Sequence, residues 1–408
     1  MSALRFKDTN GQAFETPDEL TIRDLFDKVK TLNQDGKNKN VITNSAEYGL
    51  VPQRDFFDKD IAVEGNTRKY TVIKDGDFVY NPRKSTTAPY GPFNCYTRKE
   101  PGIVSPLYSC LTPKNKAYTP YLLYYFSSPA WYSYIYHNGN QGGARHDRVG
   151  MTDDLLQGIP VTLPCMKEQK KITTFLSLCD ERFKLQKSKV ESLENRRKGL
   201  LQQIFSQEIR FEADDGTNYP DWEDTLLSDI LTERKLKSSG KEKVYSVSVA
   251  KGLVNQIEHL GRSFAASDTS KYKVVKPGDV VYTKSPTGDF KWGIVKQSKI
   301  DKDVIVSPLY GIFVPKSYAF GFIVDAYFSS SVRAHNYLIT QIRKGAKNTI
   351  NITNDVFLAK EICMPTSEEE AIKIQKFIEL LDKQIQIEKD KLEAIKLVKK
   401  GLLQQMFV

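Results

Sequence analysis

The sequence of 408 residues lacks the hallmarks of a membrane or secreted protein. It contains no run of about 18 apolar residues, so we expect no membrane-spanning helix. The first residues, MSALRFKDTNG, do not form a signal-peptide pattern. Cysteine is scarce: there are five residues, an odd number, and none of them form a CxxC pair. We therefore expect reduced, buried thiols and a cytoplasmic protein.

Motifs of common catalytic chemistries are also missing. There is no GxxxxGK[ST] P-loop, no HExxH and no GxSxG. The string nearest to the Asn/Asp-Pro-Pro-Tyr signature of adenine methyltransferases is NPRKS at Asn81–Ser85, and it does not fit. The four histidines have no metal-ligand spacing, and we interpret His146 as a solvated loop residue. No motif indicates catalysis, a cofactor or a metal in this chain.

Acidic residues are fewer than basic ones, 50 against 60, which gives a net charge of +10. An excess of this size indicates a polyanionic partner such as nucleic acid, although many basic proteins bind none.

Nearly the whole chain is a tandem duplication. KGLLQQIF begins at Lys198 and KGLLQQMF at Lys400, an offset of 400 − 198 = 202. IVSPLY begins at Ile103 and again at Ile305, with the same offset. YTVIKDGDFVY and YKVVKPGDVVY are related in the same way. A period of this length corresponds to a globular domain rather than to a solenoid unit.

Each copy ends in a long amphipathic segment. Apolar residues fall on 4-3 heptad steps, which predicts two long helices that pair as a coiled coil. Polar breaks fall on equivalent steps, at Gln186 and Glu388 and at Arg197 and Lys399, which favours mutual pairing. Alternatively, each helix packs on its own domain. The predicted interface residues are Ile172, Leu176, Phe183, Val190, Leu193, Ile374, Ile378, Ile385, Leu392 and Ile395.

The repeat is circular. LRFKDTNG at Leu4–Gly11 resembles IRFEADDG at Ile209–Gly216, which follows the first long helix. If a pseudo-twofold axis relates the two halves, Leu4–Gly11 packs near the end of the second helix. Such an axis also makes the two helices antiparallel.

Between the helices, each copy has an α+β pattern. The repeated YTVIKDGDFVY and YKVVKPGDVVY segments predict strand–turn–strand units. GIVSPLYSCL and VIVSPLYGIF are short apolar runs that fit buried strands, and two short helices follow each of them. A last strand ends at Pro164 or Pro365, and the long helix then begins.

Basic and amide residues cluster in the predicted loops of both copies. Lys and Arg neutralise phosphates, and Arg and Gln can also read base edges. The skeleton repeats while the loops differ, which suits two similar domains that read different sequences; the alternative is ordinary solvated surface. The candidate DNA-binding residues are Lys37, Lys39, Arg83, Lys84, Gln141, Arg145, Arg148, Lys235, Lys237, Lys241, Lys284, Arg343, Lys344 and Lys347.

With these features the chain resembles the specificity subunits of type I restriction–modification systems along its full length. The family's domain ending is similar to Pro164, Glu168-Gln169, Ile172 and Asp180, followed by KGLLQ. The second copy repeats this order but has Ala371 in place of the glutamine. The segment before the second domain, with Trp222, also looks like the family's lead-in to a recognition domain.

The resemblance implies a non-catalytic subunit that recognises a bipartite, asymmetric site in double-stranded DNA. Two modification subunits, which hold S-adenosylmethionine and methylate adenine, would dock on it. Restriction subunits would add ATP-dependent cleavage, with Mg²⁺ also expected on the partners and no cofactor in this chain. A coiled-coil scaffold with incidental charged loops is the alternative function, and a stand-alone nuclease is disfavoured because no carboxylate cluster for Mg²⁺ is evident.

The expected architecture is two similar mixed α/β target-recognition domains joined by two long helices that form an antiparallel coiled coil. The expected parts are an N-terminal conserved segment (1–20), the first recognition domain (21–165), a central conserved region with the first long helix (166–222), the second recognition domain (223–365) and a C-terminal conserved long helix (366–408).

Overall fold

The computed structural model describes residues 4–56, 66–139, 147–257, 268–341, 343–344 and 350–407. The chain divides into two compact units: Met1–Ser188 with Lys389–Val408 form unit 1, and Lys189–Glu388 form unit 2. The two longest helices, α6 (Met166–Phe205) and α12 (Glu368–Met406), each contribute residues to both units. Within the described ranges, no helix combines the length and the apolar character needed to cross a membrane.

Unit 1 is built around a four-stranded antiparallel sheet with the order β2-β9-β6-β7. Three two-stranded pairs accompany it, β1 with β10, β3 with β4, and β5 with β8. In chain order the elements of this unit before α6 are β1 (Asp18–Thr21), α1 (Ile22–Leu25), β2 (Phe26–Lys28), β3 (Ile42–Ser45), β4 (Gly49–Pro52), α2 (Gln53–Phe56), η1 (Asn66–Lys69), β5 (Thr71–Ile73), β6 (Phe78–Tyr80), β7 (Phe93–Cys95), β8 (Gly102–Val104), β9 (Ser109–Pro113), η2 (Lys116–Tyr118), α3 (Thr119–Ser127), α4 (Tyr132–Asn138), α5 (Asp153–Gln157) and β10 (Pro160–Leu163).

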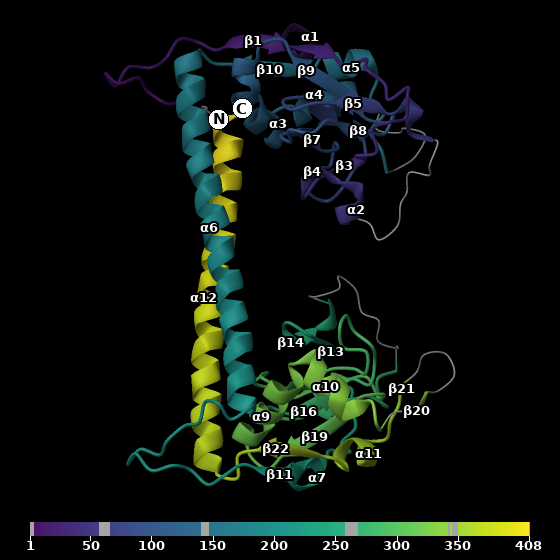
Figure 1. Ribbon diagram of the computed structural model, residues 1–408, viewed down its shortest axis with the longest axis vertical. Coiled ribbons are helices and arrows are strands. Elements are labelled where there is room, and N and C mark those ends of the chain that lie inside the picture. The colour runs from purple at the N-terminus through teal and green to yellow at the C-terminus, as the bar shows by residue number, and fades with distance from the viewer. Residues whose placement is uncertain are drawn as a thin grey trace. The chain divides into compact units, whose positions relative to one another are not determined.

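Unit 2 repeats this strand order, with the sheet β12-β19-β16-β17 and the pairs β11 with β22, β13 with β14, and β15 with β18. The central strands β16 and β19 of this sheet are labelled in Figure 1. A further short pair joins β20 and β21. Between α6 and α12 the elements are β11 (Glu223–Leu226), α7 (Leu227–Ile230), β12 (Leu231–Glu233), β13 (Tyr245–Ser248), β14 (Gly252–Asn255), β15 (Lys273–Val275), β16 (Val280–Tyr282), β17 (Val295–Gln297), β18 (Val304–Val306), β19 (Gly311–Pro315), α9 (Tyr318–Phe328), α10 (Ser331–Leu338), β20 (Arg343–Lys344), β21 (Ile350–Asn351), α11 (Asn354–Leu358) and β22 (Glu361–Met364).

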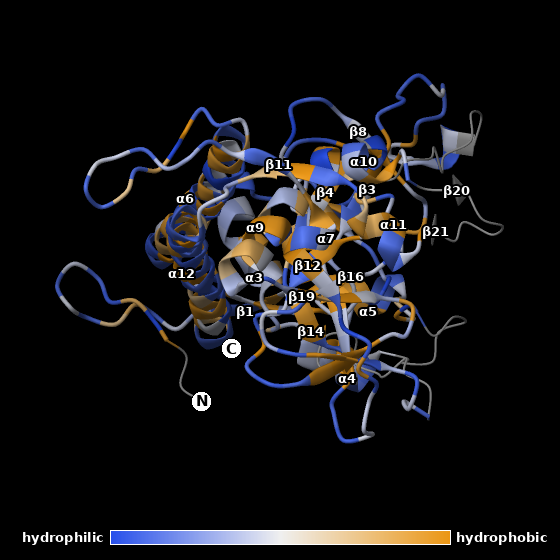
Figure 2. Ribbon diagram, turned by 90° about the horizontal axis from the view of Figure 1, so that it is seen from below, coloured by the Kyte–Doolittle hydropathy of each residue, from blue (hydrophilic) through white to orange (hydrophobic). Residues whose placement is uncertain are grey.

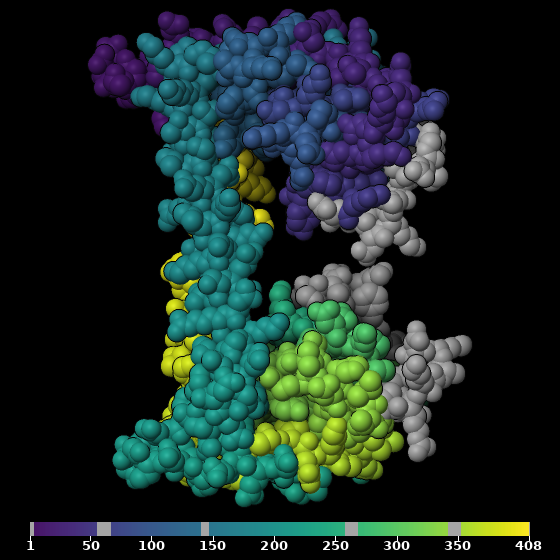
Figure 3. All heavy atoms as spheres, viewed as in Figure 1, coloured from purple at the N-terminus to yellow at the C-terminus, as the bar shows by residue number. Residues whose placement is uncertain are grey.

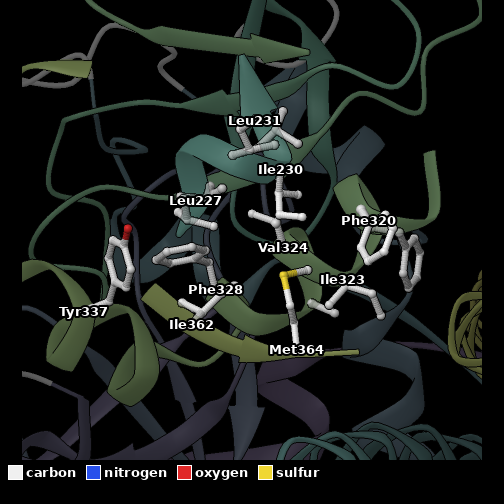
Figure 4. Close-up of a cluster of buried hydrophobic side chains, with 14 of the residues drawn as sticks. Leu227, Ile230, Leu231, Phe320, Ile323, Val324, Phe328, Tyr337, Ile362 and Met364 are labelled. Atoms are coloured by element: carbon white, nitrogen blue, oxygen red, sulfur yellow. The ribbon is translucent and has the colours of Figure 1, made fainter. Parts of the chain in front are cut away.

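Apolar strands and one helix face form the core of each unit. In unit 1, α3 lies on the sheet through Phe126, whose ring centroid is 4.1 Å from that of Phe93 on β7. In unit 2, Val324 and Phe328 of α9 pack against Ile362 and Met364 of β22 (Figure 4). Apolar residues concentrate in the strands and inner helix faces, and the loops are largely hydrophilic (Figure 2). Burial of these apolar surfaces is the main stabilising contribution.

The predicted strand–turn–strand segments are present, but their two strands do not pair with each other. β5 pairs with β8, whereas β6 pairs with β7 and β9. The turn between them contains Gly76, with φ of 89°, a conformation that favours glycine. Gly278 takes the same role in unit 2, with φ of 83°. Each segment therefore links two different sheets.

The repeated SPLY segments differ from the prediction. We expected each apolar run to be a buried strand, but Ser105–Tyr108 and Ser307–Tyr310 form turns between β8 and β9 and between β18 and β19. Only the flanking residues are buried strands. Local apolar character did not reveal that the chain reverses here.

Within each unit, a part of α6 runs antiparallel to a part of α12. In unit 1, Ile172 and Leu176 near the start of α6 share a core with Leu403 and Met406 at the end of α12. In unit 2 the roles are exchanged, because Leu201 and Ile204 at the end of α6 share a core with the first turns of α12. The long helices thus help to complete the core of each unit.

The N-terminal segment packs where the circular repeat predicts. The Leu4 amide donates a hydrogen bond to the Gln405 carbonyl, with an N···O distance of 2.8 Å, at the end of α12. The following residues form a small hairpin closed by a bridge between Lys7 and Ala13. This hairpin projects beside α6 (dark purple, upper left in Figure 3).

Candidate nucleic-acid interface

Three of the candidate cations in unit 1 lie together beyond the end of β6. Arg83 forms a backbone bridge with Arg148, and the Lys84 amide donates to the carbonyl oxygen of Asp147 at 2.8 Å. The Arg83 guanidinium is mostly exposed, with Nε 3.8 Å from the Asp147 carboxylate. Backbone pairing therefore joins cations that are about 65 residues apart in sequence beyond the end of β6, where Arg83 is exposed and Lys84 and Arg148 are half-buried.

The loop that carries Lys37 and Lys39 is shaped by asparagine side chains. The buried Asn33 side chain accepts from the Asn38 amide at 3.1 Å and donates to the Asn38 carbonyl at 2.9 Å. The side chain of Asn38 donates to the Pro101 carbonyl at 3.0 Å. Lys37 and Lys39 are exposed on this loop, and Lys37 Nζ lies 3.7 Å from the Asp35 carboxylate. The amides hold the backbone and leave both ammonium groups at the surface.

In unit 2, exposed lysines follow β12. Lys235, Lys237 and Lys241 are all exposed, and Lys237 forms a backbone bridge with Lys273 of β15. Arg234, in the same basic stretch, has a different role: its guanidinium pairs with the buried Asp279 carboxylate at 2.6 and 2.9 Å. That pair leaves Arg234 unavailable as a simple phosphate contact.

Lys284 is the most constrained of the described candidates. It is half-buried and has a φ of 54°, in the left-handed region. Burial lowers the pKa of its ammonium group, and the positive charge of Lys273 lowers it further. Gly293 packs against the backbone of Lys284, because a Cβ on residue 293 would lie 2.9 Å from the Lys284 backbone nitrogen. The backbone is therefore held in a strained conformation by its neighbours.

Lys273 completes this basic group, although its place in an apolar strand concealed it from sequence reasoning. Its Nζ donates to the Tyr310 carbonyl at 2.6 Å, and burial lowers its pKa. The Glu233 carboxylate opposes that shift and accepts from Asn354 Nδ2 at 2.6 Å. The sequence signal that could have found Lys273 was the repeat, because this lysine stands where the first copy has Thr71, at the offset of 202.

Several candidate residues are not placed. Gln141, Arg145, His146 and Lys347 lie outside the described residues. Arg343 and Lys344 form β20, and their side chains are also outside the described set.

The predicted helix-interface residues divide into buried and half-buried sets. The half-buried ones are Phe183, Leu193, Leu392 and Ile395. The buried ones are Ile172, Leu176, Val190, Ile374, Ile378 and Ile385.

Polar breaks in the heptads carry ion pairs. Arg197 pairs with Asp382 in unit 2, and Lys399 pairs with Asp180 in unit 1. The two pairs occupy equivalent repeat positions, because each member is offset from its counterpart by 202. In unit 2 the buried Glu388 also lies 3.1 Å from Lys189 Nζ. Arg197, Lys399 and Glu388 are therefore each matched by a charge of opposite sign on the facing helix.

The face of each long helix turned away from these contacts carries exposed leucine or isoleucine. On α6, Leu178 is 58% and Leu185 is 64% exposed. On α12, Leu380 is 67% and Ile387 is 45% exposed. Both pairs are spaced by seven residues and are repeat equivalents of each other. The heptad analysis followed the buried stripe and missed this outer one.

No family model matches the chain. Over 98% of its length it is 24% identical to the specificity subunit of the type I restriction enzyme MjaVIII from Methanocaldococcus jannaschii, of which it covers 94%. The S subunit of a type I restriction–modification system from M. genitalium has a similar fold, with a TM-score of 0.50 and 15% identity over 100% of this chain and 99% of that one. A chain solved in work on complex assembly and conformational transition of the type I R-M system gives a TM-score of 0.56 and 13% identity over 97% and 99% of the two chains.

These similarities confirm the predicted resemblance. The chain has a mixed α/β fold of the kind found in type I restriction–modification S subunits. It is similar in sequence, along almost its whole length, to a type I specificity subunit.

Proposed function

We propose that this chain is the sequence-specific DNA-binding subunit of a type I restriction–modification complex. The observation that supports this most strongly is the similarity to a curated specificity subunit over 98% of the chain. Fold similarity to S subunits over 97% or more of the chain agrees with it. The net charge of +10 suits a partner with a phosphate backbone.

Each recognition domain, 21–165 and 223–365, reads one half of a bipartite, asymmetric site in double-stranded DNA. The cations beyond β6 and around β15 and β16 neutralise phosphates, and the loops that differ between the copies read different bases. The N-terminal segment (1–20), the central region (166–222) and the C-terminal helix (366–408) form the frame. In this frame the long helices make an antiparallel coiled coil with pseudo-twofold symmetry.

The division of labour follows from the same assignment. This chain supplies specificity and no catalysis, in the cytoplasm. Modification subunits bind S-adenosylmethionine and methylate adenine, and restriction subunits use ATP and Mg²⁺. The chain itself holds no cofactor.

The exposed outer stripe supports docking of two copies of one partner. Leu178 and Leu185 in unit 1 repeat as Leu380 and Ile387 in unit 2, so each unit offers an equivalent apolar helix face. Two equivalent faces suit two identical modification subunits, each of which buries one face.

The test is a selection of duplexes from a random library by the full chain, co-expressed with the proposed modification subunit. We expect a single bipartite sequence, bound more tightly than random duplexes across a salt series. Mapping of adenine methylation in the host genome, with and without the gene, should return the same sequence. Equal binding to selected and random duplexes, with no change in methylation, would favour the scaffold alternative and reject the proposal.

A further inference from the structure

Two leucines at equivalent repeat positions stand exposed at the tips of turns. Leu107 is 56% exposed and Leu309 is 72% exposed, the largest value among the large apolar side chains of the described residues. Both belong to a Ser-Pro-Leu-Tyr turn, and 309 − 107 gives the repeat offset of 202. Single exposed leucines are common on proteins, but here the same exposed leucine occurs in both units.

The turns present these leucines rigidly. In unit 1 the Tyr108 amide donates to the Ser105 carbonyl at 3.0 Å, and the Leu107 amide donates to Ser105 Oγ at 3.3 Å. In unit 2 the corresponding distances from Tyr310 and Leu309 are 3.1 and 3.3 Å. Proline at the second position fixes φ, and the following tyrosine packs against a buried cluster.

Turn formation gives no reason for leucine at this position. The third position of such turns favours small or polar residues, which compete less for apolar burial. The leucine side chains are exposed, and the neighbouring tyrosines, not the leucines, pack on the buried clusters. An interaction with another molecule remains as the physical reason for keeping an apolar side chain in both copies.

Strand register places both leucines near the strand ends that basic residues also flank. The last pair of the β16–β19 register is Tyr282 with Gly311, two residues before Lys284 and two residues after Leu309. The Lys273 ammonium group donates to the carbonyl of Tyr310, the residue next to Leu309. In unit 1 the last pair of the β6–β9 register is Tyr80 with Ser109, three residues before Arg83 and two residues after Leu107.

We propose that Leu107 and Leu309 make apolar contacts with the bases of DNA, one leucine in each half-site. The surrounding cations hold the phosphates while the leucine packs on a thymine methyl group or enters a base step. An uncharged contact of this kind adds sequence selectivity without adding to the salt dependence. The inference rests on the proposed DNA-binding function and extends it to residues that carry no charge.

The experiment uses the full chain with its modification subunit, a duplex selected from a random library by the parent complex, and a random duplex of equal length. Leu309→Ala should bind the selected duplex about tenfold more weakly, with an unchanged salt slope and unchanged affinity for the random duplex. A new selection should relax positions in one half-site only. Leu107→Ala should do the same for the other half.

Two control variants keep the test specific. Leu309→Met retains an apolar side chain of similar volume and should bind as the parent does. Val314→Ala changes a residue on the same strand, β19, that is 36% exposed and lies toward the other end of that strand, and it should also bind normally. Replacing each thymine of the selected site by deoxyuridine separates the two forms of contact: weaker parent binding identifies a methyl contact, and unchanged binding identifies a base-step contact.

The outcomes of the two ideas can be distinguished. If the parent complex selects no duplex, the proposed function itself fails. If it selects one, and both alanine variants bind it with parental affinity and base preference, the leucine inference is wrong. Equal weakening on selected and random duplexes would also overturn it, because a base contact must discriminate between sequences.

Discussion

Charged side chains in this chain divide according to what they contact. Arg5, Arg210 and Arg234 each pair with a buried carboxylate, so their charge is committed to the fold. Lys37 and Arg83 instead lie at the surface, close to partly exposed aspartates. Ion pairs between exposed groups contribute little to stability and are easily exchanged for phosphates. The charge that is available to a polyanion is therefore concentrated at particular loops and strand ends.

Lys284 offers a test that separates DNA binding from stability. Lys284→Ala and Lys284→Gly both remove the ammonium group, so each should weaken binding to all duplexes and reduce the salt slope by about one unit. The glycine variant should be more stable than the alanine variant by about 1 kcal/mol, because φ of 54° strains any residue with a Cβ. Salt-dependent binding and urea unfolding of both variants provide the measurement.

Lys299→Ala is the matched control for the lysine experiment. Lys299 is exposed beyond the end of β17 that pairs with Val280, at the opposite end of the sheet from Lys284. It should leave the salt slope unchanged. A parental slope in both Lys284 variants would remove this residue from the interface.

At the scale of elements, a buried glutamate in the first turn of each long helix accepts hydrogen bonds from an arginine, and we call this arrangement a clamp. The buried Glu168 carboxylate of α6 accepts from the Arg5 guanidinium at 3.1 and 2.5 Å. Glu370 of α12 accepts from Arg210 Nε at 3.0 Å and from Trp222 Nε1 at 3.1 Å. A second hairpin, closed by a bridge between Glu212 and Asn218, precedes unit 2's first strand. Lys171 Nζ donates to the Lys7 carbonyl at 2.6 Å, and Lys373 Nζ donates to the Glu212 carbonyl at 2.7 Å. The clamps attach the hairpins of the circular repeat to the helix starts.

Glu370→Ala should lower the free energy of unfolding of unit 2 by about 3 kcal/mol. The substitution leaves the guanidinium of Arg210 without its buried partner and the Trp222 indole without an acceptor. Urea unfolding, monitored by tryptophan fluorescence, measures the change. Asp221→Ala is the control: that aspartate is fully exposed and 3.6 Å from Arg210, and its removal should leave stability near that of the parent. Similar losses of unfolding free energy in both variants would show that the buried Glu370 contributes no more to stability than the exposed Asp221.

The whole molecule allows a test of whether the long helices measure the DNA spacer. The boundary between the units crosses α6 after Ser188 and α12 after Glu388. Inserting seven residues at both points keeps the heptad phase and leaves the pairings inside each unit unchanged. Two added helical turns lengthen the helices by about 10 Å. If the chain functions as proposed, the half-sites should stay the same and the spacer should grow by about three base pairs, at 3.4 Å each.

Duplex selection with the insertion variant measures the new spacer. Insertion of four residues at both points is the control, because it rotates the apolar stripe out of phase and should abolish selection. A fully active seven-residue variant that selects the original spacer would contradict the idea that the long helices measure the spacer length.

Much of the fold could be predicted because it depends on local patterns. Heptad steps predicted both long helices, since a 3.5-residue period cannot be satisfied by strands. Prolines at 164 and 365 predicted where the last strand of each unit ends, and the structure ends β10 and β22 one residue earlier. The echo of Leu4–Gly11 at Ile209–Gly216 predicted that the N-terminal segment packs at the end of α12, which the Leu4–Gln405 hydrogen bond confirms.

The candidate site could be predicted only in part, because strand pairing between distant residues determines it. The sequence by itself determined the duplication, the helices and the family resemblance, all of which follow from strings repeated at a fixed offset. Tertiary structure decided that the charge of Lys273 acts on Lys284 and that Arg234 serves the fold through Asp279. It also decided that Leu107 and Leu309 face solvent on turns. The physical reason is that exposure and charge neighbourhood depend on which strands hydrogen-bond, and no local period specifies that choice.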